Sequence, residues 1–423
     1  MIQYKAKKID ITPLRPARLT GMGQGVESQG IHSSLEINAL VFKQDETCIY
    51  MFSIDTLFIS NALKKFIMRE VQAYDQSILE KDIVIMSTHT HYAPSLEEKR
   101  IELGERDEAY FLFLTEKIVE LMQQLKAEIF TEIALEISSG KTTHLTCNRR
   151  RKVRRLGAIF KTFIAMEPNL NGFKNEEFKI IKITTANSNK NLLGVIWSFP
   201  CHPTNLFANN LVSAEFPGEV RNVLRLKEVA QELPVFYMPG FAGDVRAYPP
   251  KRVSFSKVIR DFFQLSYPVS YYRFTNNKEY NSWVDDLCNH FLHVWSNACF
   301  NPEIYNTELT SRMIQKDVSI LGIHAAGIES IIFRKISMGN KLAFYTISSE
   351  VVSEYTLILD EIANEEFCIY SGYADEVFGY LPTQKQIIEG GYESKEYFKP
   401  FLVTGDFNPS IEKTIAACFR EIN

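Results

Sequence analysis

The chain has 423 residues, 45% of them hydrophobic, with a formal net charge of −4 and an isoelectric point near 6.1. This length allows one large domain or two ordinary ones, and the apolar content supports a sizeable core. The charge gives no reason to expect a nucleic-acid partner.

The N-terminal segment and the cysteines bear on location. The start, "MIQYKAKKIDITPLRP", lacks the apolar stretch of a secretion signal, and no apolar run reaches the ~18 residues of a membrane span. Seven cysteines without a CxxC pair do not resemble a disulfide framework. We therefore expect a cytoplasmic protein with reduced thiols and no transmembrane segment, although secretion by an unusual route stays open.

Buried strands are predicted along much of the chain. Most are continuous apolar runs bounded by polar residues or glycine, a pattern typical of strands covered on both faces. The predicted strands are 35–42, 47–59, 82–88, 132–138, 178–186, 192–199, 233–238 and 341–348.

Helical patterns lie between these strands. Apolar residues recur at helical spacing in 107–126, and 217–233 opens with Pro217 at a plausible first helical position. A third helix is predicted over 348–362, with Ser348 or Ser349 as N-cap. Strands and helices mix without a strict βαβ rhythm. We therefore predict a mixed α/β fold with mixed β-sheets flanked by helices, in one large domain over 1–423.

Residues 251–306 differ from the rest because they are helical in tendency and rich in aromatic residues. Two interpretations stay open: an inserted subdomain or lid, which could offer an acyl pocket, or more of the core. The aromatic residues that would line such a pocket are Phe262, Phe263, Tyr271 and Tyr272.

Three histidines follow predicted strands. His89 and His91 come just after strand 82–88, and His202 follows strand 192–199. Residues i and i+2 of a continuing strand face the same side, so both members of the HxH pair could reach one site. Catalytic zinc typically takes three protein ligands and keeps a position open for water. The alternative is a hydrogen-bonded polar pair at a strand end.

The other five histidines carry weaker signals. His144 is interpreted as structural, and His290 and His293 as packing residues of a helix. His32 and His324 have glycine neighbours and are interpreted as turn residues or as supports for a site.

Two further stretches are unusual. "GFAGDVRAYPP" places Gly240, Gly243, Asp244 and Arg246 in a turn after strand 233–238, where glycine permits close backbone approach to a ligand. "NRRRKVRR", residues 148–155, is a basic run without interleaved aromatic residues, which argues against nucleic-acid binding.

Together these motifs resemble the neutral/alkaline non-lysosomal ceramidase family in their order along the chain, over roughly residues 5–400. "STHTHYAPS" is similar to the family's THTHSGP signature. The other similar stretches, in chain order, are "GMGQGVESQGIHSSLEINALVF", "FSIDTLF", "CNRR", "SFPCHPTN", "SAEFPGEV", "GFAGDVR", "SSEVVSEY" and "GYLPTQKQIIEGGYE". In the last of these, Tyr380 and Tyr392 keep the twelve-residue spacing of the family's paired tyrosines.

The resemblance implies a zinc centre and an active site. Position by position, the zinc ligands would be His89, His202, Glu350 and Tyr380. The implied active-site residues are His91, as proton carrier, and Arg149 and Tyr392, as hydrogen-bond donors to the developing oxyanion.

The sequence departs from the family at three places near the expected site. Arg246 replaces a serine implicated in activity, Tyr92 follows the histidine pair, and Glu215 replaces an aspartate. We also expect no C-terminal immunoglobulin-like domain of the kind that the family's ceramidases carry. We therefore predict substrate contacts from Arg246, Asp244 and Tyr92.

The predicted activity is zinc-dependent hydrolysis of an amide (N-acyl) bond in a small polar or anionic compound, with Zn²⁺ as cofactor. Arg246 is the expected anchor for a carboxylate or phosphate. Three alternatives stay open: a true ceramidase or lipid amidase, a zinc-dependent esterase or lactonase, and a catalytically silent binding protein that keeps the fold.

Overall fold

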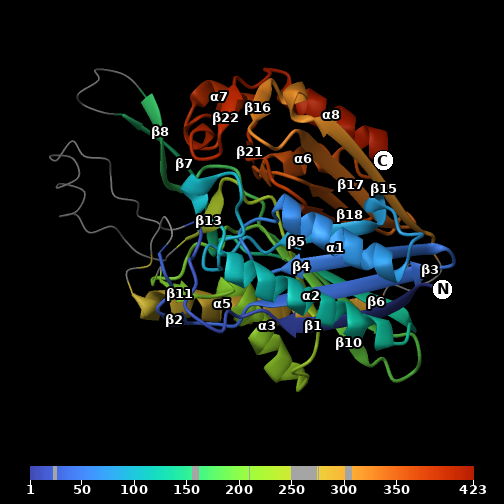
Figure 1. The fold of residues 1–423 in the computed structure, drawn as a ribbon. Helices are drawn as coiled ribbons and strands as arrows, with labels where there is room; N and C mark the ends of the chain where they lie inside the picture. Colours follow the sequence, from blue (N-terminus) through green and yellow to red (C-terminus); the bar gives the residue numbers. More distant parts are fainter. Residues whose placement is uncertain (22–25, 155–161, 209, 249–273, 275, 301–306) are drawn as a thin grey trace.

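The computed structural model describes the whole chain except residues 22–25, 155–161, 209, 249–273, 275 and 301–306. It has a mixed α/β fold built around two β-sheets that pack face to face, with helices on their outer faces (Figure 1). This confirms the predicted fold class.

The first sheet is mixed, with strand order β12-β10-β9-β6-β1-β3-β4-β5 and β14 paired to β6. Parallel pairing joins β4 to β5 and β10 to β12, and the other pairs are antiparallel. The strands are β1 (Gln3–Asp10), β3 (Glu36–Gln44), β4 (Thr47–Ile54), β5 (Ile83–Ser87), β6 (Thr131–Lys141), β9 (Glu177–Thr185), β10 (Leu192–Phe199), β12 (Val235–Pro239) and β14 (Cys299–Phe300).

The first sheet curls back on itself. Asn38 of β3 accepts a hydrogen bond from the backbone of Val235 at 3.0 Å, and Ser53 of β4 donates one to the carbonyl of Tyr237 at 2.9 Å. These contacts hold β12 against β3 and β4. The C-terminal ends of β10 and β5 therefore meet, although the two strands lie far apart in the pairing order.

The second sheet has the order β15-β17-β18-β20. Its inner face packs on the first sheet through residues such as Ile336, Phe344 and Ile369, which share a core cluster with Met51 and Phe236. Its strands are β15 (Leu309–Asp317), β17 (Ser330–Met338), β18 (Leu342–Ile347) and β20 (Phe367–Ser371).

Helices cover the outer faces. Leu63 and Ile67 of α1 (Asn61–Tyr74) and Leu114 of α2 (Glu108–Ala127) pack on β3 and β4 of the first sheet. On the second sheet, Phe419 of α8 (Ile411–Ile422) meets Phe333 of β17 edge to face. The remaining helices are α3 (Glu215–Glu228), α5 (Asn277–Ser296), α6 (Tyr355–Asp360) and α7 (Gln384–Glu389).

Short strand pairs and turns connect the layers. Of these, the parallel pair β19–β21 matters most for the site, because it aligns Glu350 with Tyr380. The remaining strands are β2 (Gly30–Ile31), β7 (Thr146–Arg154), β8 (Thr162–Asn169), β11 (Leu211–Val212), β13 (Val245–Ala247), β16 (Ile323–Ala325), β19 (Glu350–Val351), β21 (Tyr380–Leu381) and β22 (Val403–Gly405). The 3₁₀ turns are η1 (Glu80–Asp82), η2 (Ile101–Leu103), η4 (Val318–Leu321) and η5 (Glu396–Phe398).

Two predicted helices need correction. Helix α3 begins two residues before Pro217, at Glu215, and ends at Glu228. The helix predicted over 348–362 is wrong at its start, because Glu350 and Val351 form β19 and helix α6 begins only at Tyr355. The long-range pairing of β19 with β21 overrides the local helical pattern.

The described part of the aromatic-rich region 251–306 belongs largely to the core. Helix α5 buries Tyr280, Trp283, Phe291 and Trp295 in the same cluster as Trp197 of β10. The four aromatic residues expected to line an acyl pocket lie outside the described residues.

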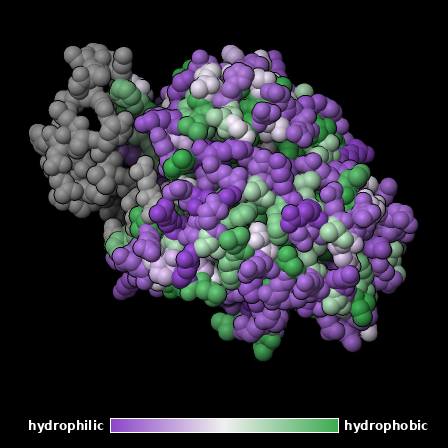
Figure 2. Space-filling model, in the orientation of Figure 1, coloured by the Kyte–Doolittle hydropathy of each residue, from purple (hydrophilic) through white to green (hydrophobic). Residues whose placement is uncertain are grey.

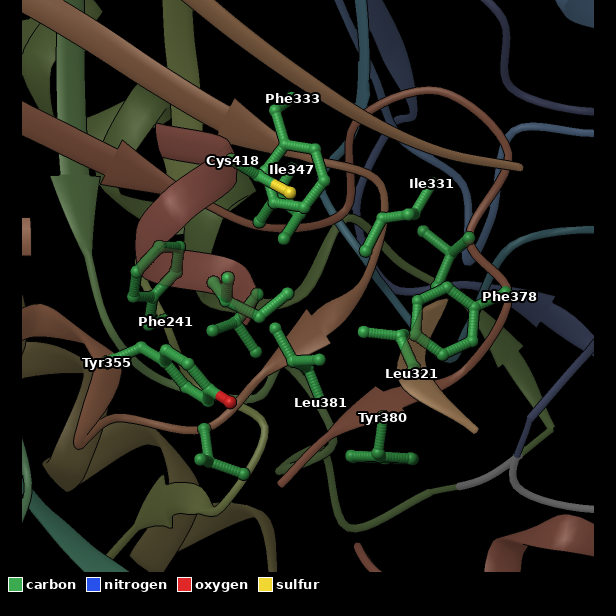
Figure 3. Packing of buried hydrophobic residues seen from close by; sticks show 14 of the residues in the cluster. Phe241, Leu321, Ile331, Phe333, Ile347, Tyr355, Phe378, Tyr380, Leu381 and Cys418 are labelled. Carbon is green, nitrogen blue, oxygen red and sulfur yellow. The ribbon is translucent and has the colours of Figure 1, made fainter. Parts of the chain in front are cut away.

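Apolar packing reaches the loops that carry predicted ligands. Phe241, Phe378, Tyr380 and Leu381 belong to the core cluster under the second sheet (Figure 3). On the face over α1 and α2, polar and apolar residues are interspersed (Figure 2). Within the described ranges, every helix is too short or too polar to cross a membrane.

Candidate metal centre

Two histidine side chains are oriented in the same way. His89, in the loop after β5, places Nδ1 3.0 Å from the carbonyl oxygen of Leu57, and His202 places Nδ1 2.9 Å from that of Ala242. A carbonyl oxygen only accepts hydrogen bonds, so each Nδ1 carries the proton. With the Nδ1 proton held in this way, Nε2 is the nitrogen left to bind a metal.

These two nitrogens meet at one point with a carboxylate. The Nε2 atoms of His89 and His202 lie 3.1 Å apart, and Oε2 of Glu350 lies 3.3 Å from the first and 3.4 Å from the second. All three side chains are buried, and Oε2 accepts no hydrogen bond from the described residues. Burial, followed by His89 and Arg149, lowers the pKa of His202 well below its usual value, which favours the neutral form of that ring.

The spacing of the three atoms fits a tetrahedral zinc site. With zinc–nitrogen bonds of about 2.05 Å, neighbouring ligand atoms lie about 3.3 Å apart. The observed separations of 3.1, 3.3 and 3.4 Å bracket this value. Facing lone pairs beside an unpartnered carboxylate oxygen are unfavourable unless a cation lies between them. The described residues therefore form a site that could hold a metal ion.

His91 lies beside this point. Its nitrogens are buried without a hydrogen-bond partner among the described residues, and it forms with His89 and His202 a group whose ligand atoms lie within 4.8 Å of one another. Burial, then His89 and Arg246, lowers the pKa of His91 well below its usual value. His91 is thus a neutral base at neutral pH, placed either to take a proton or to act as a further ligand.

A glycine makes room for His91. A Cβ atom on Gly21 would lie 2.4 Å from Nδ1 of His91, and the φ of Gly21 is +88°. Any other residue there would collide with the ring and adopt a strained backbone conformation. The glycine-rich stretch that begins at Gly21 indicated a close approach of the backbone to another group, but the sequence did not show that this group is His91.

Glu350 and Tyr380 are neighbours across the β19–β21 pair. The ring of Tyr380 is buried, and its centroid lies 5.4 Å from that of Tyr392. Burial and the Glu350 carboxylate raise the pKa of Tyr380, whereas the guanidinium of Arg149 lowers it. The fold thus brings both predicted tyrosines together with the predicted glutamate.

Arg149 lies beside both tyrosines, with its guanidinium carbon 5.5 Å from the ring centroid of Tyr380 and 5.6 Å from that of Tyr392. Its Nε donates to Glu393 at 2.6 Å, and Arg150 donates to the other oxygen of Glu393 at 2.5 Å. Nη2 of Arg149 is buried without a hydrogen-bond partner among the described residues. This nitrogen is therefore a charged donor available to a ligand.

Glu393 was not anticipated from the sequence. It lies next to Tyr392 and forms ion pairs with two buried arginines of the basic run, so it fixes both Arg149 and the loop that carries Tyr392. A buried arginine needs a carboxylate partner, but a single sequence does not say which carboxylate will reach it. Arg151, the next residue of the run, is exposed and pairs with Glu167 instead.

Asp244 and Tyr92, expected to contact substrate, are held within the scaffold. Asp244 is fully buried and accepts hydrogen bonds from Asn148 at 2.9 Å, the Ser353 backbone at 2.8 Å and Gln386 at 3.1 Å. Tyr92 is also fully buried, and its hydroxyl donates to the Leu206 carbonyl at 3.0 Å. Through these contacts, both side chains join segments that are distant in the sequence.

Arg246 lies closer to the reactive groups. Its Nη2 donates to Oγ1 of Thr204 at 2.6 Å and to the carbonyl of the same residue at 3.2 Å. Its charge contributes to the lowered pKa of His91, and its backbone forms a bridge with His202. Arg246 thus lies beside His91 and His202.

Glu215 is linked to the same region through Asn205. The amide of Asn205 donates to the carbonyl of His202 at 2.8 Å and to Oε2 of Glu215 at 3.3 Å, which links the start of α3 to a predicted ligand. Glu215 is fully buried with a φ of +58°, and burial raises its pKa to about 8.

This buried acid predicts a pH-dependent stability. Between pH 4.5 and 8 the folded state holds a proton on Glu215 that the unfolded state releases, so the free energy of unfolding falls as pH rises through this window. The loss approaches about 5 kcal/mol at pH 8, at 1.36 kcal/mol for each pKa unit. Glu215→Gln removes the titration. We expect thermal melts at pH 5 and pH 8 to show the variant gaining stability relative to the parent at the higher pH.

The exposed Glu232 provides a matched control, because Glu232→Gln removes a carboxylate just after the same helix. A constant difference in melting temperature between Glu215→Gln and the parent from pH 5 to pH 8 would show that Glu215 is ionised in the folded protein.

Tyr373 is a second residue that the sequence did not reveal. Its buried ring lies against the ring of His89, with centroids 4.2 Å apart and planes inclined by 31°. Nothing in the local pattern "SGYADEV" distinguishes it from a core tyrosine.

Comparison with known proteins places this geometry on a known fold. No family model and no curated protein matches the sequence. Among solved structures, the neutral ceramidase from Pseudomonas aeruginosa matches with a TM-score of 0.73 and 15% identity, over 100% of this chain and 74% of that chain. A structure described as ceramidase complexed with C2 matches with the same values. The chain therefore has a ceramidase-like fold.

Proposed function

We propose that the protein is a zinc-dependent hydrolase that cleaves an amide (N-acyl) bond. The observation that carries this proposal is the convergence of Nε2 of His89, Nε2 of His202 and Oε2 of Glu350 within 3.1 to 3.4 Å, with both Nδ1 protons held by backbone carbonyls. Imidazole and carboxylate ligands suit zinc, and Tyr380, paired with Glu350, would complete the set. The ceramidase-like fold supports the same reaction class.

The residues around this point divide the work of hydrolysis. Zinc, when bound, supplies Lewis acidity to a carbonyl and lowers the pKa of water. His91, a neutral base, takes the proton from the attacking water and gives it to the leaving nitrogen. Arg149, through its unpartnered Nη2, and Tyr392 donate hydrogen bonds to the carbonyl oxygen as it gains negative charge.

Arg246 supports a polar or anionic substrate. A guanidinium beside the histidines attracts a carboxylate or phosphate on the compound being cleaved. Replacing Arg246 should therefore change the preference between anionic and neutral substrates. We expect Arg246→Ser to reduce kcat/KM for an N-acyl amino acid by about 10-fold to 100-fold, the loss of about one charge-assisted hydrogen bond. The matched neutral N-acyl amide should change by less than about threefold.

The measurement is steady-state kinetics on both substrates, with zinc content checked in each preparation. Equal losses on the anionic and the neutral amide would show that Arg246 supports the fold of the site and does not select charge.

A true ceramidase or lipid amidase is the second candidate, favoured by the solved structures that share the fold. Release of fatty acid from a short-chain fluorescent ceramide tests it directly. The proposed function itself is tested by a panel of N-acyl amides and matched esters on the zinc-loaded protein and after chelation. Zinc-dependent amide turnover is expected. Turnover of esters alone would point to an esterase or lactonase, and binding without turnover to a silent protein.

A further inference from the structure

Tyr373 lies at the junction of the two segments that carry predicted ligands. Its backbone N–H donates to the carbonyl of Ser349 at 3.1 Å, directly before Glu350, and its carbonyl accepts from the N–H of Ser87 at 3.1 Å, two residues before His89. A Cβ atom on Gly372 would lie 2.6 Å from the Ser349 oxygen, so the chain passes very close there. One residue therefore ties the loop of His89 to the turn of Glu350.

The side chain of Tyr373 lies on His89 itself. Its ring is 1% exposed, with its centroid 4.2 Å from that of His89, against 6.2 Å from that of His202. The hydrogen bond from Nδ1 of His89 to Leu57 restrains one edge of the imidazole, and rotation about the Cβ–Cγ bond is the motion that would move the ring away from this contact. A flat surface against the face of the ring restricts this rotation, which sets where Nε2 points.

Both members of this pair adopt a backbone conformation that is uncommon for residues other than glycine. Tyr373 has a φ of 61° and His89 a φ of 62°, both in the left-handed region. A bulky residue adopts this conformation only where its surroundings require it, and such residues cluster at functional sites. The hydroxyl of Tyr373 is buried without a hydrogen-bond partner among the described residues, so the contact that the structure shows between Tyr373 and His89 is the one between their rings.

We propose that Tyr373 is a positioning residue of the metal centre, whose ring holds the imidazole of His89 in the orientation that binds zinc. The inference rests on the proposed zinc site and adds a residue to it. Partners that orient a ligating histidine commonly contribute 10-fold to 100-fold in metal affinity.

The test compares three variants of the full-length protein. Tyr373→Leu removes the flat face, and Tyr373→Phe keeps it and deletes only the hydroxyl. Tyr345→Leu is the matched control, a fully buried tyrosine of β18 whose hydroxyl bonds Glu365 and Asn423. Zinc affinity is measured by competition with a chromophoric chelator, and the geometry of the site by the visible absorption of the cobalt-substituted protein.

We expect Tyr373→Leu to weaken zinc binding by about 10-fold to 100-fold and to alter the cobalt spectrum. Tyr373→Phe and Tyr345→Leu should keep the parent's affinity within about threefold and its spectrum. If Tyr373→Leu fails to fold, Tyr373→Met, which fills similar volume without a flat face, takes its place.

Two results would overturn the inference alone: parent-like zinc affinity and spectrum in Tyr373→Leu, or an equal loss in Tyr373→Phe, which would assign the effect to the hydroxyl. A parent protein that binds no zinc would overturn the proposed function together with this inference.

Discussion

Replacing His202 with alanine or Glu350 with glutamine is expected to abolish both zinc binding and turnover. The first change removes a ligand nitrogen and the second removes the carboxylate charge from a group of atoms that lie within 3.4 Å of one another, so the proposed ligand set is left incomplete. Because changes in supporting residues already cost 10-fold to 100-fold, loss of a ligand should lower kcat/KM by at least about a thousandfold. Zinc content per chain and amide turnover are the measurements.

Without metal, the Glu350→Gln variant should still fold and should be at least as stable as the metal-free parent. Glu350→Gln removes a buried carboxylate oxygen that faces two nitrogen lone pairs, a repulsive arrangement once zinc is gone. The metal-free variant should therefore melt at or above the metal-free parent. His290→Ala is the control, since His290 lies on α5 and packs beside Phe178 of β9. Full zinc content in His202→Ala and in Glu350→Gln would contradict the assignment of the ligands.

Replacing Arg149 with methionine is expected to lower kcat by about 100-fold to 1000-fold, the usual effect of removing one donor to a developing oxyanion. Zinc content should stay at the parent's level, because Arg149 offers no ligand atom. Glu393 keeps its second partner, Arg150, at 2.5 Å, so the loop of Tyr392 should remain in place.

Arg151→Met is the matched control on the same strand, since Arg151 is exposed and pairs with Glu167 away from the site. Kinetics with a saturating neutral amide separate kcat from KM. A normal kcat for Arg149→Met, with KM alone raised, would move Arg149 from oxyanion stabilisation to substrate binding.

The sequence was most informative where local patterns decide the structure. Continuous apolar runs predicted β3, β5 and β10, and the polar turns after them located His89 and His202. These strands are buried on both faces, so their composition alone reveals them. The fold class followed from the same runs.

Other features depend on contacts between distant segments. Glu350 was predicted to lie at the start of a helix. In the structure it belongs to strand β19, because Glu350 and Val351 pair with Tyr380 and Leu381 of β21. The curl that joins the ends of β5 and β10 depends on Asn38 and Ser53, whose role no local pattern records. The pairing of Arg149 with Glu393 and the contact of Tyr373 with His89 likewise join residues more than 200 positions apart.

Several residues singled out in the sequence have structural roles that the local patterns did not predict. Glu215 is a fully buried acid with a pKa raised to about 8, tied through Asn205 to His202. Tyr92 and Asp244, expected near substrate, are fully buried with hydrogen bonds to Leu206 and to three separate segments. Of the three residues expected to contact the substrate, Arg246 is the one whose charge helps to lower the pKa of His91.

The most direct test of the zinc centre is an anomalous difference map from crystals of the zinc-loaded protein, with data collected on both sides of the zinc absorption edge. We predict one peak about 2.0 to 2.2 Å from Nε2 of His89, Nε2 of His202 and Oε2 of Glu350. No peak among these atoms, with zinc bound elsewhere or nowhere, would contradict the account.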